Sequence, residues 1–493
     1  MKRGSGILMH ISSLPSKYGI GSIGKQAYEF VDFLYETGQK YWQILPIGPT
    51  SYGDSPYQSF STFAGNPYFI DLDILAESGA LKESEYAALN WGDDAEKVDY
   101  EAIFENRFKV LKLAFKREKI TKKKEIEKFR YYNSYWVENY AMYIALKFKY
   151  DLVSYQEWPE DIKLRKPQAV VNTYEELSEE IDFWVYVQYL FNSQWTALKI
   201  YANDKGIKII GDIPIYVAED SADAWAHNEI LMLDEDRTPI KVAGCPPDYY
   251  APLGQLWGNP IYDWKYLKSS GYEWWTQRIK AALKMYDIVR IDHFRAFDAF
   301  YTIDYGRKDA VIGEWMKGPG TDFFEVLKTR LGKDPAIIAE DLGTITDDVR
   351  ALLKFSGFPG MKVMQFGFDP VSDSEYLPHN FVKNSVAYIG THDNDTLIGW
   401  YNQESENVKR FIDRYLRLNE KEGLTWGFIN SLLASVSDIA IISMQDLLGL
   451  GSEARMNIPS TLGGNWQWRM KSMDCLTDDL KNRLKDSTSI YKR

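Results

Sequence analysis

The chain has 493 residues, two to three times the roughly 100–200 residues of a typical domain, which excludes fibre, peptide and disulfide-scaffold classes. Its formal net charge is −12, from 58 basic and 70 acidic residues. No basic stretch stands apart to neutralise phosphates, so we expect no nucleic acid partner.

Cysteine usage and hydropathy indicate the compartment. Cys245 and Cys475 are far apart and lack metal-ligand spacing, which favours a reducing compartment without structural zinc. The apolar run at residues 6–9 is too short for a signal peptide, and no run approaches the ~20 apolar residues of a membrane span. We therefore expect a cytoplasmic protein with no membrane partner.

Tryptophan, tyrosine and phenylalanine form 15% of the chain. Aromatic rings stack on the apolar C–H faces of sugars, so this excess is compatible with carbohydrate binding. A large core that simply uses aromatic residues explains the excess equally well.

Short apolar runs recur along the chain, each followed by turn residues and most by a helical pattern. There are eight of them: 6–10, 41–45, 208–212, 287–292, 336–340, 361–366, 386–390 and 439–443. Continuous apolar strands alternating with helices indicate a parallel sheet covered by helices. Eight such units predict an α/β fold of the (β/α)₈, or TIM, barrel type.

Three of the intervening helices can be delimited. The first has an apolar stripe at Ala27, Phe30, Val31 and Leu34, with Ser22 as its expected N-cap and Gly38 as its end. The second runs from an N-cap at Thr346 to about Gly357. The third runs from about Ser178 to Gly206, directly before the third strand.

Two intervals are too long for a single helix. Residues 84–200 predict a helical insertion subdomain, and the aromatic-rich residues 217–270 predict a lid or loop insertion at the C-terminal mouth of the barrel. Residues 1–493 are then one catalytic barrel. The chain ends soon after its eighth strand and last helices, so we expect no C-terminal β-sandwich domain.

Four acids stand at or just after the ends of predicted strands: Asp212, Asp292, Glu340 and Asp393. A single acid so placed is commonly a helix cap. Four together indicate a cluster, because the active sites of such barrels lie at the C-terminal ends of the strands.

Two of these acids have neighbours that suggest different ionisation states. Arg290 and Asp292 point to the same face of one strand, so the guanidinium can keep the carboxylate ionised. Glu340 leaves an apolar strand with no adjacent base, which suits a protonated carboxyl. An ionised nucleophile facing a protonated general acid is the arrangement of a retaining glycosidase, with the two carboxyl groups about 5–5.5 Å apart.

Seven groups of peptides, in chain order, resemble the amylomaltase family, the 4-α-glucanotransferases or disproportionating enzymes of the α-amylase clan. The segments are 53–58, 65–68, 211–217, 246–258, 290–295, 339–343 with 391–396, and 456–466. Together they span the chain from end to end.

The resemblance implies roles for individual residues. Asp292 is the nucleophile, Glu340 the acid/base, and Asp393 the third acid, which holds hydroxyls of the distorted donor sugar. Further implied substrate-binding residues are Asp212, Arg290 and His392 in the donor subsite, Tyr57, Gln255 and Trp257 around donor and acceptor, Tyr250 on a lid, Asn457 and Pro459 near the donor, and Tyr52 at a secondary glucan site. No metal and no cofactor are expected.

The implied reaction is transfer of α-1,4-glucan segments between malto-oligosaccharides through a covalent glycosyl-enzyme. Segment 244–260 is long enough to close over the cleft, exclude water and hold an acceptor hydroxyl. Two alternatives stay open, an α-amylase-type hydrolase and a non-catalytic glucan-binding scaffold, although the three retained acids argue against the scaffold. The oligomeric state is left open.

Overall fold

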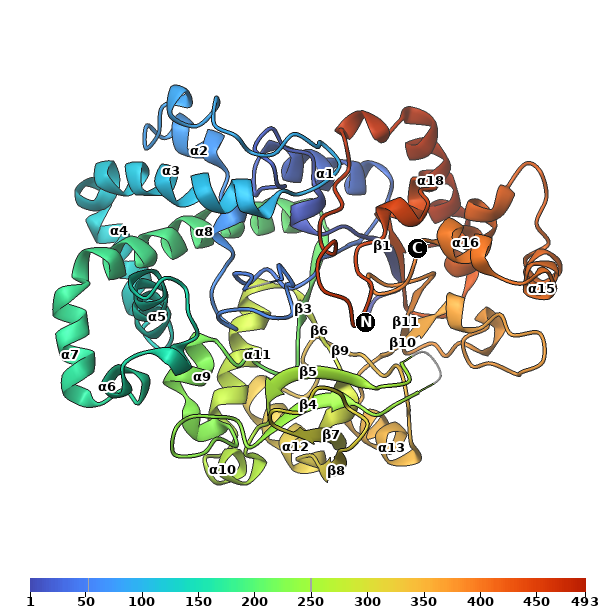
Figure 1. Ribbon diagram of the computed structural model, residues 1–493. Coiled ribbons are helices and arrows are strands. Elements are labelled where there is room, and N and C mark those ends of the chain that lie inside the picture. The colour runs from blue at the N-terminus through green and yellow to red at the C-terminus, as the bar shows by residue number, and fades with distance from the viewer. Residues whose placement is uncertain (52, 249–250) are drawn as a thin grey trace.

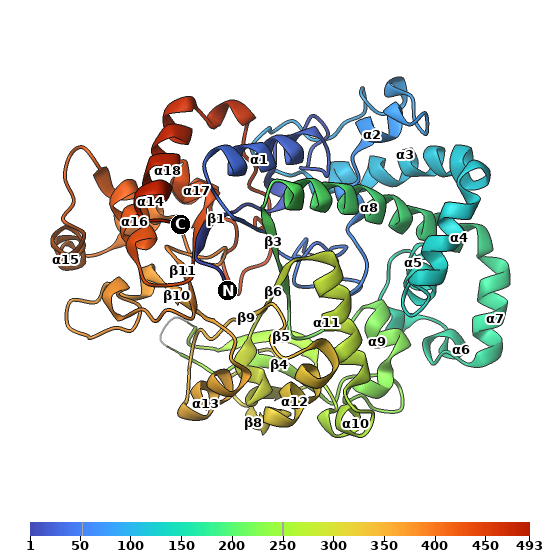
Figure 2. The same cartoon turned by 180° about the vertical axis from the view of Figure 1, so that it is seen from behind.

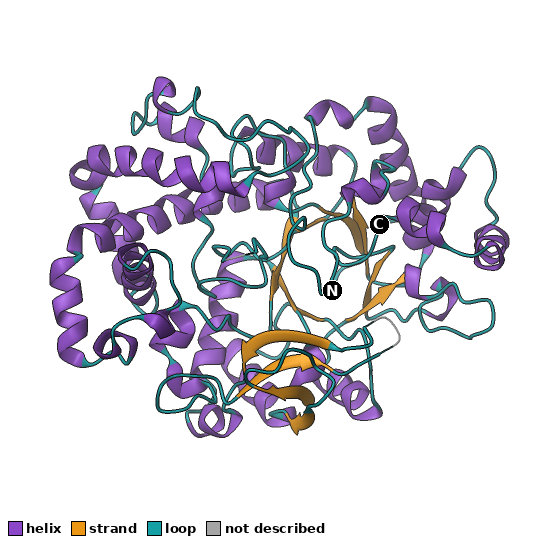
Figure 3. Cartoon of the chain, viewed as in Figure 1, coloured by secondary structure: helices purple, strands orange, loops and turns teal. Residues whose placement is uncertain are grey.

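The computed structural model describes residues 1–51, 53–248 and 251–493. Its centre is an eight-stranded parallel sheet in the order β10-β11-β12-β1-β2-β3-β6-β9, curved into a ring (Figure 3). The strands are β1 (Gly4–Leu8), β2 (Tyr41–Gln43), β3 (Lys208–Ile213), β6 (Ile288–Ile291), β9 (Ile337–Ala339), β10 (Gly360–Val363), β11 (Ser385–Tyr388) and β12 (Ile439–Ser443).

All eight predicted strands are confirmed, and with them the (β/α)₈ fold class. The ring closes where the Ala339 amide at the end of β9 donates to the carbonyl of Pro359, just before β10, at 3.0 Å. Every residue of these strands except Lys208 is buried. Burial on both faces of a parallel sheet explains why each strand is an unbroken apolar run in the sequence.

The three delimited helices are α1 (Lys25–Glu36), α13 (Asp347–Ser356) and α8 (Ser178–Asp204). For α13 the predicted cap is confirmed, since the Thr346 side chain accepts from the Val349 amide and Gly357 follows with a positive φ of 78°. The N-cap predicted for α1 is wrong. Gly24 holds that position, and the Ser22 hydroxyl instead donates to Asp71 at 2.6 Å, tying the helix start to a distant loop.

The long interval between β2 and β3 is helical. It contains α2 (Leu72–Glu77), α3 (Tyr100–Thr121), α4 (Lys123–Tyr132), α5 (Val137–Lys149), α6 (Glu160–Lys163) and α7 (Pro167–Glu176), followed by α8. In both views α3 to α7 lie together on one side of the barrel (Figures 1 and 2). Helix α8 returns from this group to the barrel and leads into β3.

A second sheet, which the sequence analysis did not predict, lies beside the ring (Figure 3). Its antiparallel strands are β5 (Gln255–Pro260), β4 (Lys241–Cys245), β7 (Ala299–Asp304) and β8 (Glu314–Lys317), in that order. The expectation of a loop throughout 217–270 is therefore wrong for β4 and β5, and also for α9 (Ala222–Ala226) and α10 (Trp264–Ser269). Strand β4 pairs with β7, more than fifty residues away, so local sequence carries no signal of the sheet.

The remaining helices complete the outer layer. They are α11 (Glu273–Met285), α12 (Gly320–Leu331), α14 (Leu397–Gln403), α15 (Glu406–Leu416), α16 (Gly423–Ala434), α17 (Met444–Leu447) and α18 (Asp478–Ile490). After β12 the described chain contains helices and loops but no further strand, in agreement with the absence of a C-terminal sandwich. Within the described residues, no helix combines the length and apolarity needed to cross a membrane.

Candidate active site

The acids predicted at the strand ends converge on one guanidinium. Asp212 on β3 and Arg290 on β6 are cross-strand partners, and Arg290 Nη1 lies 2.5 Å from Asp212 Oδ2. Its Nη2 lies 3.0 Å from Oδ1 of Asp292, the residue directly after β6. Arg290 and Asp212 are almost fully buried, whereas 29% of the Asp292 side chain is exposed. The base therefore fixes Asp292 from below and leaves its other side open to a ligand.

Burial dominates the ionisation of Asp292. It raises the pKa of this carboxyl to about 6, while Arg290 lowers it and the charges of Asp212 and Asp393 raise it further. The sequence suggested that Arg290 keeps Asp292 ionised. The direction of the arginine effect is confirmed, but the net pKa shift is upward, because two acids from other strands share the same base.

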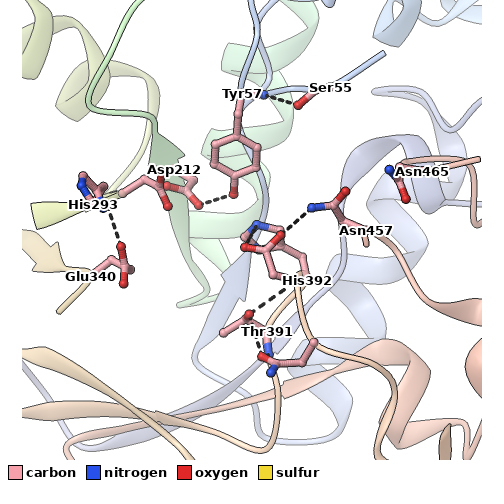
Figure 4. Close-up of polar contacts among 12 residues, drawn as sticks. Ser55, Tyr57, Asp212, His293, Glu340, Thr391, His392, Asn457 and Asn465 are labelled. Atoms are coloured by element: carbon pink, nitrogen blue, oxygen red, sulfur yellow. Dashed lines mark hydrogen bonds and ion pairs between the residues drawn. The ribbon is translucent and has the colours of Figure 1, made fainter. Parts of the chain in front are cut away.

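Glu340, directly after β9, is buried beside Asp292. Its Oε2 accepts from the His293 amide and its Oε1 from the Leu342 amide, both at 2.7 Å (Figure 4). Burial, followed by the negative charge of Asp292, raises the pKa of Glu340 to about 8, against the opposing effect of Arg290 and these amides. Near neutral pH the pair therefore holds one proton on Glu340 and a charge on Asp292.

The backbone at His293 is shaped to hold Glu340. His293 has a φ of 54°, in the left-handed region that non-glycine residues seldom adopt. This turn directs the His293 amide at the Glu340 carboxylate, and the Phe294 amide donates to the Glu340 carbonyl at 3.0 Å. Strain of this kind persists where the surrounding structure imposes it, commonly at functional sites.

A second wall of the site carries Asp393, in the loop after β11. Asn457 Nδ2 donates to Asp393 Oδ1 at 2.6 Å, and His392 Nε2 lies 3.3 Å from Oδ2 (Figure 4). The Tyr57 ring stacks on His392 with centroids 5.1 Å apart, and its hydroxyl donates to Asp212 Oδ2 at 2.8 Å. Asp393, His392, Tyr57, Asp212 and Arg290 are thus one connected network, to which Asn457 adds a further contact.

A third wall comes from the second sheet. Gln255 and Trp257 lie on β5, and Trp257 Nε1 donates to Gln255 Oε1 at 3.1 Å. The Trp257 ring meets the ring of His293 edge to face, with centroids 4.8 Å apart. This contact places β5 next to the turn that holds Glu340.

Three predicted residues are not part of this network. Tyr250 and Tyr52 lie outside the described residues. Pro459 lies in an exposed part of the loop that begins at Asn457.

Several contributors were not predicted. Trp466 packs against both Tyr57 and His392, and its carbonyl accepts from the Tyr100 hydroxyl at 2.9 Å. The backbone amides of His293 and Leu342 carry no side-chain signature, so only the quoted peptides around Asp292 and Glu340 point to them. Asp212 Oδ1 is buried without a hydrogen-bond partner, which leaves a free acceptor at the floor of the site.

Comparison with known proteins agrees with this geometry. The family model for 4-alpha-glucanotransferases matches residues 9–476. The 4-alpha-glucanotransferase of Clostridium butyricum is 51% identical over 98% of this chain and 100% of its own length, and that of Streptococcus pneumoniae is 50% identical over 100% and 98%. The structure of the amylomaltase from Streptococcus agalactiae in complex with acarbose is similar at a TM-score of 0.97, with 45% identity and full coverage of both chains. The chain therefore belongs to the 4-alpha-glucanotransferase family.

Proposed function

We propose that this member of the family transfers α-1,4-glucan segments between malto-oligosaccharides by a retaining double displacement, with Asp292, Glu340 and Asp393 as its catalytic acids. The observation that carries the proposal is the pair of neighbouring carboxyls whose pKa values differ, about 6 for Asp292 and about 8 for Glu340. A retaining transfer needs this combination of one charged and one protonated acid.

In the first step, Asp292 attacks the anomeric carbon of the donor sugar and Glu340 gives its proton to the departing glycosidic oxygen. The new covalent bond joins the donor to Asp292, and the shortened glucan leaves with the Glu340 proton. Asp393, held by Asn457, and the free Oδ1 of Asp212 are acceptors for hydroxyls of the donor sugar. Such contacts strengthen as the sugar ring distorts in the transition state.

In the second step, Glu340 takes a proton from the 4-hydroxyl of an acceptor glucan, which attacks the anomeric carbon and releases Asp292. Transfer dominates over hydrolysis when an acceptor is held in place and water is excluded. Gln255 and Trp257 on β5 stand next to Glu340 and are the proposed contacts to the acceptor. We also propose that residues 84–200 and 217–270 are insertions that shape the mouth of the cleft.

Incubation with pure maltotriose tests the proposal. We expect glucose and a ladder of longer oligomers with little change in the number of reducing ends. A steady rise in reducing ends indicates an α-amylase-type hydrolase, and binding of amylose without loss of iodine colour indicates the glucan-binding scaffold.

Two variants test the assigned roles. Asp292→Ala and Glu340→Gln should each lower the rate by several orders of magnitude while the fold, measured by circular dichroism, is retained. Near-normal turnover by either variant contradicts the assignment. The cytoplasmic location, and the expectation that neither a metal nor a cofactor is required, remain predictions.

A further inference from the structure

Trp315 on β8 is the most exposed of the sixteen tryptophans. Its exposed fraction is 45%, and the other fifteen are buried or half-buried. A large aromatic side chain left this accessible has a high cost in water unless something covers it during function.

The Trp315 ring is also held in place. The Arg295 guanidinium carbon lies 4.0 Å from the ring centroid, and Tyr301 on the neighbouring strand meets the ring edge at 5.4 Å. A cation over an aromatic face stabilises the arrangement. Trp315 therefore presents a rigid ring, which loses little side-chain entropy when a ligand stacks on it.

Arg295 connects this ring to the catalytic centre. It stands three residues after Asp292, in the short helical turn Phe294–Phe297. Its Nη1 donates to the carbonyl of Thr344 at 2.6 Å, in the loop that follows Glu340. Trp315 is thus separated by one side chain from the two loops that carry the proposed nucleophile and acid.

The second sheet provides a continuous surface between the two places. Strand β5, which carries Gln255 and Trp257, is three strand spacings from β8, about 14 Å at the usual spacing. Figure 1 shows β8 at the outer edge of this sheet, below β4 and β7. Leu253, just before β5, is 63% exposed, and its carbonyl accepts from Ala310 at 3.0 Å. Val311 and Ile312, just before β8, are 48% and 60% exposed.

We propose that Trp315 is an outer acceptor platform, on which a glucose unit remote from the scissile bond stacks when the acceptor is an α-glucan chain rather than free glucose. This inference rests on the proposed function and deepens it, because it assigns the length of acceptor that the site prefers. The glucan is the favoured occupant because the ring is continuous with the active-site wall through Arg295 and β5. A single exposed and rigid indole also suits a sugar face, which is small and carries its hydroxyls at the rim.

The test measures how the Michaelis constant of the acceptor depends on its length. Amylose is the donor, and labelled glucose, maltose and maltotetraose are the acceptors. In Trp315→Ala we expect the KM for maltotetraose to rise about fivefold to tenfold and the KM for glucose to change less than twofold, with kcat unaltered. Trp315→Tyr should recover most of the loss, because it restores an aromatic face.

Tyr131→Ala is the matched control. Tyr131 is 76% exposed on α4, in the helical group on the other side of the molecule (Figure 1), so its removal should leave every acceptor KM unchanged. An equal change for all acceptor lengths in Trp315→Ala overturns the platform. So does a change in oligomeric state by sedimentation with unchanged acceptor kinetics, which assigns the ring to a contact between copies of the chain.

A binding experiment separates this inference from the proposed function. Calorimetry with maltoheptaose on Glu340→Gln, with and without Trp315→Ala, measures the platform without turnover. Weaker binding in the double variant supports the platform even if the wild-type chain forms no ladder from maltotriose. Equal affinity overturns the platform even if the wild-type chain transfers glucan segments normally.

Discussion

Removal of the Arg290 charge is the sharpest test of the electrostatics of the site. In the wild-type protein the rate should fall below pH of about 6, as Asp292 takes up a proton, and above pH of about 8, as Glu340 loses one. Arg290→Met removes the one cation in direct contact with Asp292, 3.0 Å from its carboxylate. The pKa of Asp292 must then rise, since burial and the charges of Asp212 and Asp393 remain.

The size of the effect follows from the distance. Two unit charges 3.0 Å apart attract by about 1.4 kcal/mol at the dielectric constant of water and by about 5.5 kcal/mol at an effective value of about 20. The lower figure alone corresponds to about one pH unit. Because the Asp292 side chain is 29% exposed, screening places the result between these limits. The acidic limb should therefore move from about pH 6 to about 7 or higher, and the narrowed profile should lower the maximal rate.

The assay is the pH dependence of kcat/KM for maltotriose, and Arg290→Lys is the control, since it keeps a positive charge and should move the acidic limb less. Arg290→Met also leaves Asp212 buried without its ion pair, so folding has to be checked by circular dichroism. If Arg290→Met does not fold, Asp212→Asn with Arg290→Met removes the stranded charge and keeps the test. A folded variant whose acidic limb stays at the wild-type pH, or moves lower, refutes the reasoning.

Two further predictions concern Glu340 and Asn457. Because the folded-state pKa of Glu340 is raised to about 8, the wild-type protein loses stability as the pH rises from about 4 through 8, by at most about 5 kcal/mol. Glu340→Gln should therefore melt at a higher temperature than wild type at pH 9 and at a similar one below pH 4, and calorimetry showing equal Tm values at pH 9 contradicts this. Asn457→Ala removes the 2.6 Å hydrogen bond to Asp393 and should lower kcat/KM about tenfold to a hundredfold. Asn457→Asp places a like charge there and should cost more, so a rate equal to that of the alanine variant counts against the contact.

The barrel could be predicted because each of its strands is defined locally. A strand such as β12 is buried at all five positions, and its run of apolar residues is visible without knowledge of its neighbours. The same holds for α13, where Thr346 and Gly357 mark both ends. The antiparallel sheet has no such signal, because its edge strand β8 is half exposed and β4 pairs with a strand far along the chain.

The chemistry of the site was predictable to the same degree. Arg290 and Asp292 lie two residues apart on one strand, so their ion pair follows from the alternation of side chains. The contact of Arg290 with Asp212 requires β3 and β6 to be neighbours in a particular register, which the local pattern does not determine. Likewise, the amides of His293 and Leu342 reach Glu340 only because of the backbone turns around it.

The ionisation of the two central acids shows how these levels combine. Burial raises the pKa of both Asp292 and Glu340, so burial alone does not distinguish a nucleophile from an acid. Arg290 supplies the difference, because its guanidinium is in direct contact with Asp292, whereas Glu340 faces the negative charge of Asp292 and neutral amides. Between pH of about 6 and 8 the pair therefore carries a single proton, held on Glu340. The division of roles thus depends on which strand neighbours β6, and exchanging the two acids in sequence without moving the arginine should not exchange their functions.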